Sequence, residues 1–304
     1  MFRKITRKYI RNFLHYFKLV LKQLPILMEN PFYFLKEYLE ISKSIISKVL
    51  VEFPDINLDR INRKIHGVNF PFYFKFAPRY RSMYLGLNST SVIRVLLKHI
   101  KKKSVFIDAG ANIGYMSAVG AALVGKHGGV HCFEPVPIYL EKLEEMANKN
   151  KEYEIIVNKF ALGESLKKST ININKVLIGA NSMVSGLVDS DLVKDTIEVD
   201  VKRLDDYILE KDIKNISLIK IDVEGYELPL LKGLTRFFEK NINSLPPLIV
   251  EITPEAYALL ESKLEDLENL LAKFDYQAYN SDEKHRIDIK KLEQLTDVLF
   301  KQTK

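Results

Sequence analysis

The chain is 304 residues long, enough for one large domain or two small ones, and its apolar share of 47% is ordinary for a globular protein with a sizeable core. The formal net charge of +7 is confined to residues 1–25, which hold seven basic residues and no acid, leaving 39 basic against 39 acidic residues elsewhere. A body without net charge argues against an enzyme that binds nucleic acid. The single cysteine, Cys132, excludes an internal disulfide framework and favours a reducing compartment, hence a cytoplasmic location.

Residues 2–24 form an amphipathic helical pattern, with aromatic and aliphatic residues on one face and basic residues on the other. This composition is typical of a helix lying in an anionic membrane surface, but it also fits a helix docked on its own domain with a solvated basic face. We therefore expect residues 1–65 to be a helical N-terminal extension and residues 66–304 to be the main domain. No stretch reads as a transmembrane span, so any membrane contact through residues 2–24 would be peripheral, at the inner membrane surface.

The main domain alternates apolar strand and helix patterns, which predicts an α/β fold. Residues 66–87 are rich in aromatic residues and prolines and predict a hairpin or lid ahead of that fold. The expected strands are 105–107, 130–133, 154–158, 216–222 and 248–252, with added strands at 170–174, 196–201, 277–280 and 297–300, and the expected helices are 91–100, 113–124, 137–148, 227–238 and 254–274. This order is that of a doubly wound, mostly parallel sheet.

The stretch from Ser104 to Glu134 reads as a strand, a glycine turn, a helix and a second strand. The apolar run before Asp108 fits a strand buried on both faces. Gly110 and Gly114 follow in a tight turn, where glycine permits a sharp bend and leaves room for a ligand. Glu134 ends the second strand, where a carboxylate can accept hydrogen bonds from both hydroxyls of a ribose. The unit therefore predicts a nucleoside pocket.

The charge of this turn favours one nucleoside over another. The segment 108–114 lacks the G-x-G-x-x-G pattern that holds a pyrophosphate, and it begins with an acid. An anionic start suits a cationic amino-acid group better than a diphosphate. S-adenosylmethionine carries an amine, a sulfonium and a ribose, so its charges match the pocket. A plain strand–turn–helix unit without any ligand is the alternative that this stretch leaves open.

A second group of acids follows the strand at 216–222. Asp222 and Glu224 stand at its carboxyl end, where ligands bind in an open parallel sheet, and Glu251 lies at the end of the next strand. A methyl acceptor must be aligned and made nucleophilic, so Asp222 is the first candidate for its base and Glu224 the second. Either acid could instead orient the acceptor, hold a cation such as Mg²⁺ or interact with a helix dipole, and we assign no metal site. Lys220 is expected to pair with a neighbouring carboxylate rather than reach the pocket.

Six segments together resemble the FkbM family of S-adenosylmethionine-dependent methyltransferases, and they occur in the family's order. The segments are FIDAGANIGYMS (106–117), FEPVP (133–137), NKFALGES (158–165), GANSMV (179–184), LIKIDVEGYELPLLKG (218–233) and PLIVEIT (247–253). The paired DxGANxG and KIDVEGxE motifs are specific in combination, although either alone would be a moderate signal. The resemblance spans roughly residues 79–300, and nothing in the first 65 residues matches it.

The resemblance implies a class I methyltransferase fold, a seven-stranded sheet ending in an antiparallel hairpin, with S-adenosylmethionine as cofactor. It implies that the methionine end of the cofactor is lined by Asp108, Gly110, Asn112 and Gly114, the ribose bound by Glu134, and the adenine approached by Asn158, Ala161 and Leu162. We therefore expect an O-methyltransferase that acts on a hydroxyl of a carbohydrate, glycolipid or natural product and has no nucleic acid partner. The alternatives are an NAD-dependent oxidoreductase, disfavoured by its missing central glycine, and a non-catalytic membrane-peripheral protein on the same scaffold.

Overall fold

The computed structural model describes residues 31–32, 35, 60–73, 83–84, 89–175 and 179–303. The helix expected at 2–24 lies outside these residues, as do parts of the hairpin or lid expected at 66–87. The chain divides into two compact units, Met1–Arg94 and Val95–Lys304, and helix α4 (Thr90–His99) runs across the boundary.

The first unit contains a β-hairpin. β1 (Arg60–Ile65) pairs antiparallel with β2 (Val68–Tyr73), and both residues of the turn between them have positive φ, as the twist of a two-residue hairpin requires. The hairpin begins earlier than the expected 66–87, inside the proposed extension. Its first strand escapes sequence reasoning because Arg63, a charged residue, takes a buried position, with its guanidinium 5.2 Å from the centre of the Phe72 ring.

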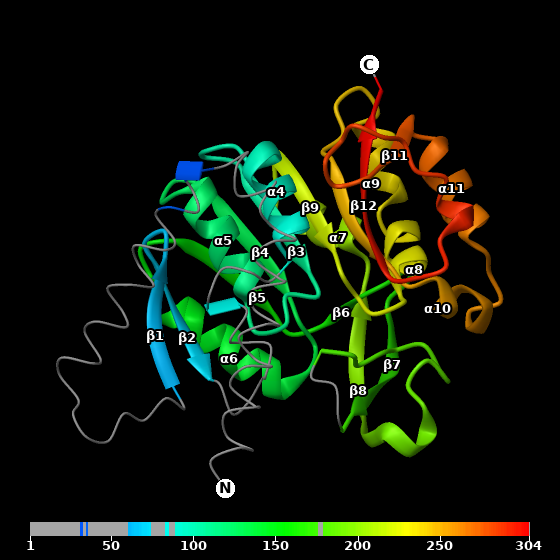
Figure 1. The fold of residues 1–304 in the computed structure, drawn as a ribbon, viewed down its shortest axis with the longest axis horizontal. Coiled ribbons are helices and arrows are strands. Elements are labelled where there is room, and N and C mark those ends of the chain that lie inside the picture. Colours follow the sequence, from blue (N-terminus) through cyan, green and yellow to red (C-terminus); the bar gives the residue numbers. More distant parts are fainter. Residues whose placement is uncertain are drawn as a thin grey trace, which may run out of the picture. The chain divides into compact units, whose positions relative to one another are not determined.

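The second unit is built on a seven-stranded sheet in the order β11-β12-β10-β9-β3-β4-β5 (Figure 1). Its strands are β3 (Val105–Ala109), β4 (Gly129–Phe133), β5 (Glu154–Asn158), β9 (Ile216–Ile221), β10 (Leu248–Ile252), β11 (Tyr276–Tyr279) and β12 (Thr296–Gln302). The strands from β10 to β5 in this order pair in parallel, while β12 runs antiparallel to both β10 and β11. The predicted mostly parallel sheet with an antiparallel last strand is confirmed, and the chain reverses its winding direction between β3 and β9.

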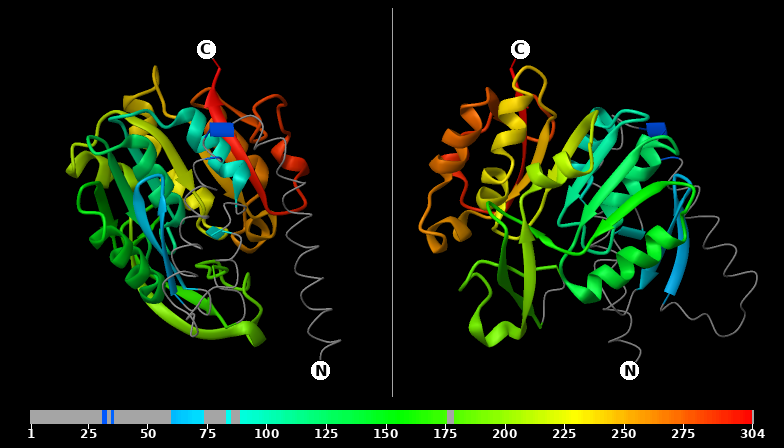
Figure 2. Two further views of the ribbon diagram at one scale, coloured as in Figure 1. Left: turned by 60° about the vertical axis from the view of Figure 1, so that its left-hand side comes forward. Right: turned by 180° about the vertical axis from the view of Figure 1, so that it is seen from behind.

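Helices lie on both faces of this sheet. They are α5 (Tyr115–Val124), α6 (Pro137–Asn148), α7 (Leu204–Glu210), α8 (Glu227–Lys232), α9 (Thr235–Lys240), α10 (Pro254–Leu259) and α11 (Leu264–Ala272), with short 3₁₀ turns at η1 (Ser190–Leu192) and η2 (Ile289–Lys291). α5 packs so closely on β3 that a Cβ at Gly120 would lie 2.3 Å from the ring of Phe106. Figure 2 gives two further views, and α11, in orange, packs on β11, the neighbour of the red strand β12. None of the described helices is long and apolar enough to cross a bilayer.

Two of the helices predicted from the sequence are wrong in extent, because each is broken in two. In the predicted helix 227–238 the break falls at Gly233, where a Cβ would lie 2.1 Å from a backbone carbonyl oxygen of the loop after β6. The predicted helix 254–274 stops after Leu259. There the N–H and the hydroxyl of Ser262 both donate to the carbonyl oxygen of Tyr257 (2.9 and 3.1 Å) and close the first half.

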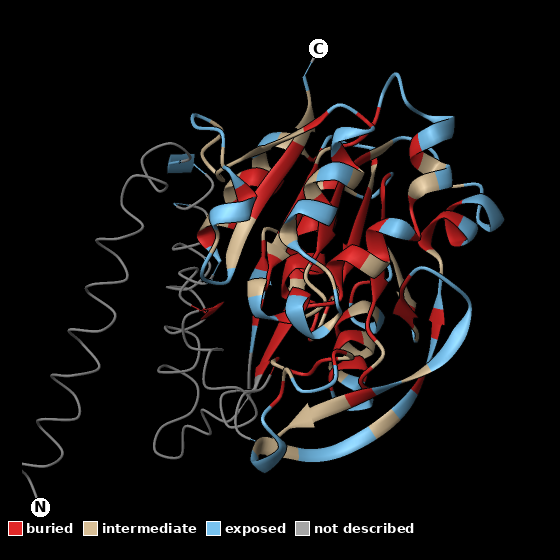
Figure 3. Cartoon of the chain, turned by 90° about the vertical axis from the view of Figure 1, so that its right-hand side faces the viewer, coloured by how far each residue is buried: buried red, intermediate tan, exposed pale blue. Residues whose placement is uncertain are grey.

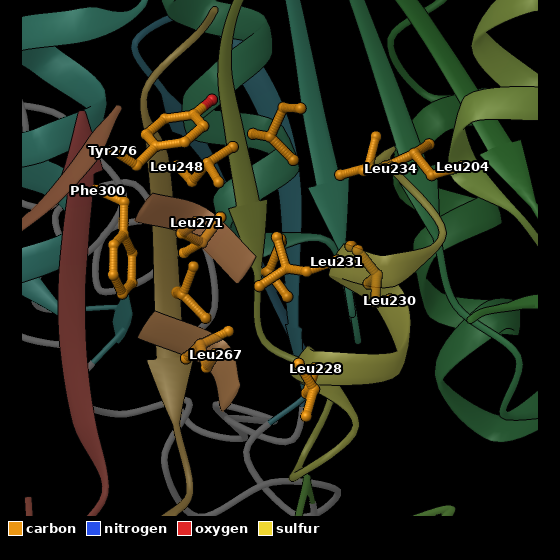
Figure 4. Packing of buried hydrophobic residues seen from close by; sticks show 14 of the residues in the cluster. Leu204, Leu228, Leu230, Leu231, Leu234, Leu248, Leu267, Leu271, Tyr276 and Phe300 are labelled. Atoms are coloured by element: carbon orange, nitrogen blue, oxygen red, sulfur yellow. The ribbon is translucent and has the colours of Figure 1, made fainter. Parts of the chain in front are cut away.

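The apolar core of the second unit fills the face of the sheet covered by α7, α8 and α11. Figure 4 shows its side chains converging from strands and helices, among them Leu228, Leu231, Leu248 and Phe300. All four are at most 2% exposed. Burial of one such leucine contributes on the order of 2 kcal/mol. Figure 3 shows the same pattern at the level of the ribbon, with the central strands red and the outward helix faces pale blue.

A separate three-stranded sheet interrupts the alternation of strands and helices. β6 (Ala161–Leu162), β7 (Lys167–Asn174) and β8 (Val193–Lys202) are ordered β6-β8-β7, and β7 and β8 pair antiparallel along their length. The added strands predicted at 170–174 and 196–201 lie inside β7 and β8. This sheet is far less buried than the central one, as the alternating polar residues in both strands required.

Candidate active site

Buried polar contacts hold the turn that follows β3. Asp108, the second-last residue of β3, is fully buried, and its Oδ2 accepts a hydrogen bond of 2.6 Å from the hydroxyl of Ser117. The backbone N–H groups of Gly110 and Ala111 both donate to the carbonyl oxygen of Phe133 at the end of β4 (3.0 and 2.9 Å). The turn is therefore fixed against the carboxyl end of the neighbouring strand.

The two glycines of the turn also have a packing role within the protein, beside the room for a ligand that the sequence predicts. Gly110 has a φ of 77°, and a Cβ there would lie 1.7 Å from the carbonyl oxygen of Asp222. Gly114 has a φ of 86°, and a Cβ would meet the side chains of Leu143 and Met146 at 2.7 and 2.8 Å. Gly110 combines a positive φ with a backbone contact that excludes any side chain, whereas at Gly114 the ends of two flexible side chains would have to shift.

Glu134 ties the turn to the start of α6. Its Oε2 accepts a hydrogen bond from the N–H of Asn112 and its Oε1 one from the N–H of Val136, both at 2.8 Å. Burial raises the pKa of Glu134 to about 7, because two N–H donors offset only part of the lost hydration. Asn112 itself has a left-handed φ of 52°, and its Oδ1 accepts from the next N–H at 2.8 Å, which suits asparagine to this place.

Of the three residues expected near the adenine, Asn158 contacts this acid, and all three are buried in contacts within the protein. Asn158 accepts a backbone hydrogen bond from Glu134 (3.1 Å), and its side-chain Nδ2 donates to the carbonyl oxygen of Cys132 (3.1 Å). Ala161 and Leu162 form the short strand β6 and are buried, Leu162 within the apolar core. A place for these three residues beside the adenine stays a prediction that rests on the resemblance.

The second group of acids is brought together as expected. One carboxylate oxygen from each of Asp222, Glu224 and Glu251 lies within 4.8 Å of the others, and all three residues are half-buried. Burial, followed by the negative charges of Asp222 and Glu224, raises the pKa of Glu251 to about 10, so this carboxyl keeps its proton at neutral pH. Such clusters are common without an ion, and we assign no metal to this one.

Lys220 joins the two groups. Its side chain is 6% exposed, and its Nζ lies 3.2 Å from Oδ1 of Asp108 and 3.1 Å from Oδ2 of Asp222. It also donates to the carbonyl oxygen of Gly110 at 3.3 Å. Burial alone would lower the pKa of Lys220, but the two carboxylates raise it above its ordinary value, so the group is an ammonium. The predicted pairing with a neighbouring carboxylate is confirmed, with two partners in place of one.

Sequence reasoning missed the residues that anchor the loop at 179–184. The hydroxyl of Tyr139 in α6 accepts hydrogen bonds from the N–H of Gly179 (2.9 Å) and from Nδ2 of Asn181 (3.0 Å). The hydroxyl of Ser182 donates to the carbonyl oxygen of Glu224 at 2.6 Å. The loop is thus attached to α6, the helix that follows Glu134, and to Glu224 of the acidic cluster. The one signal in the sequence that this loop has a function was the GANSMV segment, which occurs in the order typical of the family.

The fold and this site define a class of protein. The strand order, the reversal of winding between β3 and β9, the acid-led glycine turn after β3 and the acid after β4 are together the layout of a class I methyltransferase.

The comparison with protein families agrees. The methyltransferase FkbM domain matches residues 108–278, more than half of the chain, so the chain belongs to the FkbM methyltransferase family. Family membership does not fit the NAD-dependent oxidoreductase considered from the sequence.

Individual relatives are distant. The hexuronic acid methyltransferase AglP of Haloferax volcanii is 28% identical over 161 residues, which are 53% of this chain and 61% of the relative, so the match spans about three fifths of that protein. Methyltransferase 1 of Beauveria bassiana is 27% identical over 183 residues, covering 53% of this chain and 71% of the relative. The crystal structure of an FkbM methyltransferase from Methylobacillus flagellatus has 20% identity and a TM-score of 0.41, covering 73% of this chain and 54% of its own.

S-adenosylmethionine is the cofactor, and the donor set of the site fits it. The carboxylates of Asp108, Asp222 and Glu224 outnumber the one buried ammonium among them, an arrangement that favours a ligand with positive charge. Each carboxyl oxygen of Glu134 accepts one hydrogen bond from a backbone N–H and has a second lone pair for a ribose hydroxyl.

Proposed function

We propose that this chain is an O-methyltransferase that transfers a methyl group to a hydroxyl of a carbohydrate, glycolipid or natural product. The observation that carries the proposal is the direct contact between the two halves of the site. Gly110 of the glycine turn packs against the carbonyl of Asp222, and one ammonium lies between the side chains of Asp108 and Asp222. A carboxylate that can take an acceptor's proton therefore lies beside the turn that receives the cofactor.

Each half of the site has a separate task in this proposal. The turn residues Asp108, Gly110, Asn112 and Gly114 hold the methionine end of the cofactor, Glu134 holds the ribose, and Asn158, Ala161 and Leu162 border the adenine. When bound, S-adenosylmethionine supplies an electrophilic methyl group. Asp222 orients the acceptor hydroxyl and takes its proton, with Glu224 as the second candidate base.

The acidic cluster favours a neutral acceptor group over an anionic one. The Haloferax relative is named a hexuronic acid methyltransferase, and a hexuronic acid offers both hydroxyls and a carboxylate for methylation. An acceptor carboxylate placed beside Asp222 and Glu224 would meet like charges, which disfavours its binding. A hydroxyl can instead donate its hydrogen to Asp222. We therefore propose that the product is a methyl ether and not a methyl ester.

The test is a labelled-methyl transfer assay with two matched probes, methyl β-D-glucuronide and methyl β-D-glucoside. We expect label in a product that survives alkali, since alkali cleaves esters and leaves ethers intact. Asp222→Asn should lower turnover by about a hundredfold or more, the usual contribution of a general base. Asp212→Asn serves as the control, because Asp212 is an exposed acid paired with Lys214. Alkali-labile label, or full turnover in Asp222→Asn, would contradict the proposal.

The N-terminal helix pattern supports a membrane-associated acceptor such as a glycolipid. We propose residues 1–65 as an extension and residues 66–304 as the methyltransferase domain, with peripheral lipid contact through residues 2–24. The full chain and a chain lacking residues 1–25 would be sedimented with anionic and with neutral liposomes. Loss of binding to anionic liposomes on truncation is the expected result, and unchanged sedimentation would assign the helix to docking on its own domain.

A further inference from the structure

Lys220 is the one buried lysine among the residues that the structure describes. It lies in β9, directly opposite Asp108 of β3 in the parallel register, at the point where the winding of the sheet reverses. A lysine in a central parallel strand is costly to bury and is retained only with partners. Neither the binding of the cofactor nor the removal of the acceptor's proton, as described above, uses this side chain.

The three contacts of Lys220 reach both halves of the site at once. Toward the cofactor half it meets Oδ1 of Asp108 (3.2 Å) and the carbonyl oxygen of Gly110 (3.3 Å). Toward the acceptor half it meets Oδ2 of Asp222 (3.1 Å). Ser117 holds the other oxygen of Asp108 from α5, so the ammonium completes a chain of contacts from α5 through β3 to the end of β9.

The geometry of the ammonium limits what can replace it. It is a compact charge on a long stem, with oxygens of Asp108, Gly110 and Asp222 at 3.2, 3.3 and 3.1 Å around it. A methionine keeps most of the stem but leaves Asp108 and Asp222 facing each other without a cation. An arginine keeps the charge but spreads it over a planar group that cannot occupy the same point.

We propose that Lys220 is a positioning residue that fixes the cofactor turn and the acceptor-side carboxylate with one ammonium, so that the two halves of the site keep one geometry. The part that concerns the acceptor rests on the proposed function; the part that concerns the cofactor rests on the family alone. Because Asp222 is only one of the three partners, losing its charge leaves the cofactor turn in place, whereas losing Lys220 releases both halves.

The test compares four variants of the full chain by calorimetry with S-adenosylmethionine, each measured well below its own melting temperature. Lys220→Met should weaken cofactor binding about tenfold or more, while Asp222→Asn should stay within about threefold of the parent. Asp205→Asn is the control for lost stability, since Asp205 is buried between Arg203 and Arg236, which are not part of the site. It should lower the melting temperature and leave cofactor affinity unchanged. Lys220→Arg keeps the charge and serves if the methionine variant fails to fold; it too should bind the cofactor several-fold more weakly.

Turnover supplies the second readout. Lys220→Met should lower kcat and raise KM for the cofactor together, whereas Asp222→Asn should lower kcat alone. Parental cofactor affinity in Lys220→Met, or in Lys220→Arg where the former is unfolded, would overturn the proposal. Cofactor binding is read without an acceptor, so this result stands even where no acceptor probe is methylated. A chain that binds the cofactor but methylates no probe would instead count against the proposed function.

Discussion

Replacing Gly110 by alanine tests whether the glycine turn is demanded by the protein itself. A non-glycine residue at a φ of 77° costs about 1–2 kcal/mol, from the crowding of Cβ in the left-handed region. The new Cβ would also lie 1.7 Å from the carbonyl oxygen of Asp222, a backbone atom that cannot rotate away. Overpacking of a well-packed site costs about 1–3 kcal/mol more, so the substitution should destabilise the chain by about 2–5 kcal/mol.

Gly186 provides the control. It has a φ of 82°, close to that of Gly110, but it is exposed, and a Cβ there would make only an ordinary contact of 3.6 Å with Leu259. Gly186→Ala should therefore cost only the backbone term of about 1–2 kcal/mol. At about 2–4 °C per kcal/mol for a domain of this size, Gly110→Ala should lower the melting temperature by about 4–20 °C and Gly186→Ala by about 2–8 °C. Equal losses in thermal unfolding would refute the argument that contact with Asp222 sets the requirement for glycine.

Three further predictions concern the same unit. Burial raises the pKa of Glu134 to about 7 from an ordinary value of 4.5, so between these pH values the folded chain keeps a proton that the unfolded chain has lost. The stability that this proton contributes is therefore lost as pH rises from about 4.5 to 7. Between pH 4 and pH 8, the free energy of unfolding of the parent should fall by about 3 kcal/mol relative to that of Glu134→Gln, as measured by urea titration. A difference between the two proteins that stays constant with pH would contradict this. Asp205 is almost fully buried, and Arg203 and Arg236 hold its pKa below the usual range against the opposing effect of burial. Asp205→Ala should cost about 3 kcal/mol by chemical denaturation, against less than about 0.5 kcal/mol for the exposed Asp212→Ala. Ser182→Ala removes the 2.6 Å bond to Glu224 and should raise KM for the acceptor without changing cofactor affinity, so an unchanged KM would separate the loop at 179–184 from acceptor binding.

Much of the fold was predictable because its strands are short apolar runs bounded by glycine, proline or acids. The strands at 154–158 and 248–252 and the helix at 137–148 occur with the predicted bounds. The errors arose where a long-range contact or a local capping hydrogen bond overrides the helical periodicity. Helices 227–238 and 254–274 have continuous helical periodicity, yet the close packing at Gly233 and the hydrogen bonds of Ser262 break them. No local pattern predicts an approach between residues seventy positions apart in the chain, such as Gly163 and Gly233.

The functional site, too, could be predicted only in part from the sequence. Asp108, Glu134 and Asp222 were predicted because each ends a strand, and the carboxyl ends of parallel strands meet at one edge of a sheet. The sequence also indicated a partner for Lys220, since a buried lysine requires one, but it did not show that one ammonium serves both Asp108 and Asp222. Tyr139 and Ser182 were missed because an ordinary helix tyrosine and a loop serine carry no pattern of their own. Their roles depend on where the loop at 179–184 returns to the sheet.

The measurement that tests the central claim most directly is calorimetry of the parent chain with S-adenosylmethionine, with NAD and the Glu134→Ala variant as the two comparisons. We expect S-adenosylmethionine to bind with a Kd in the micromolar range, on the order of −8 kcal/mol, and NAD to give no heat. A carboxylate that accepts hydrogen bonds from a ligand contributes about 1.5–3 kcal/mol, so Glu134→Ala should weaken binding by about tenfold or more. Binding of NAD in place of S-adenosylmethionine would contradict the assigned cofactor, and parental affinity in Glu134→Ala would contradict a ribose site at the end of β4.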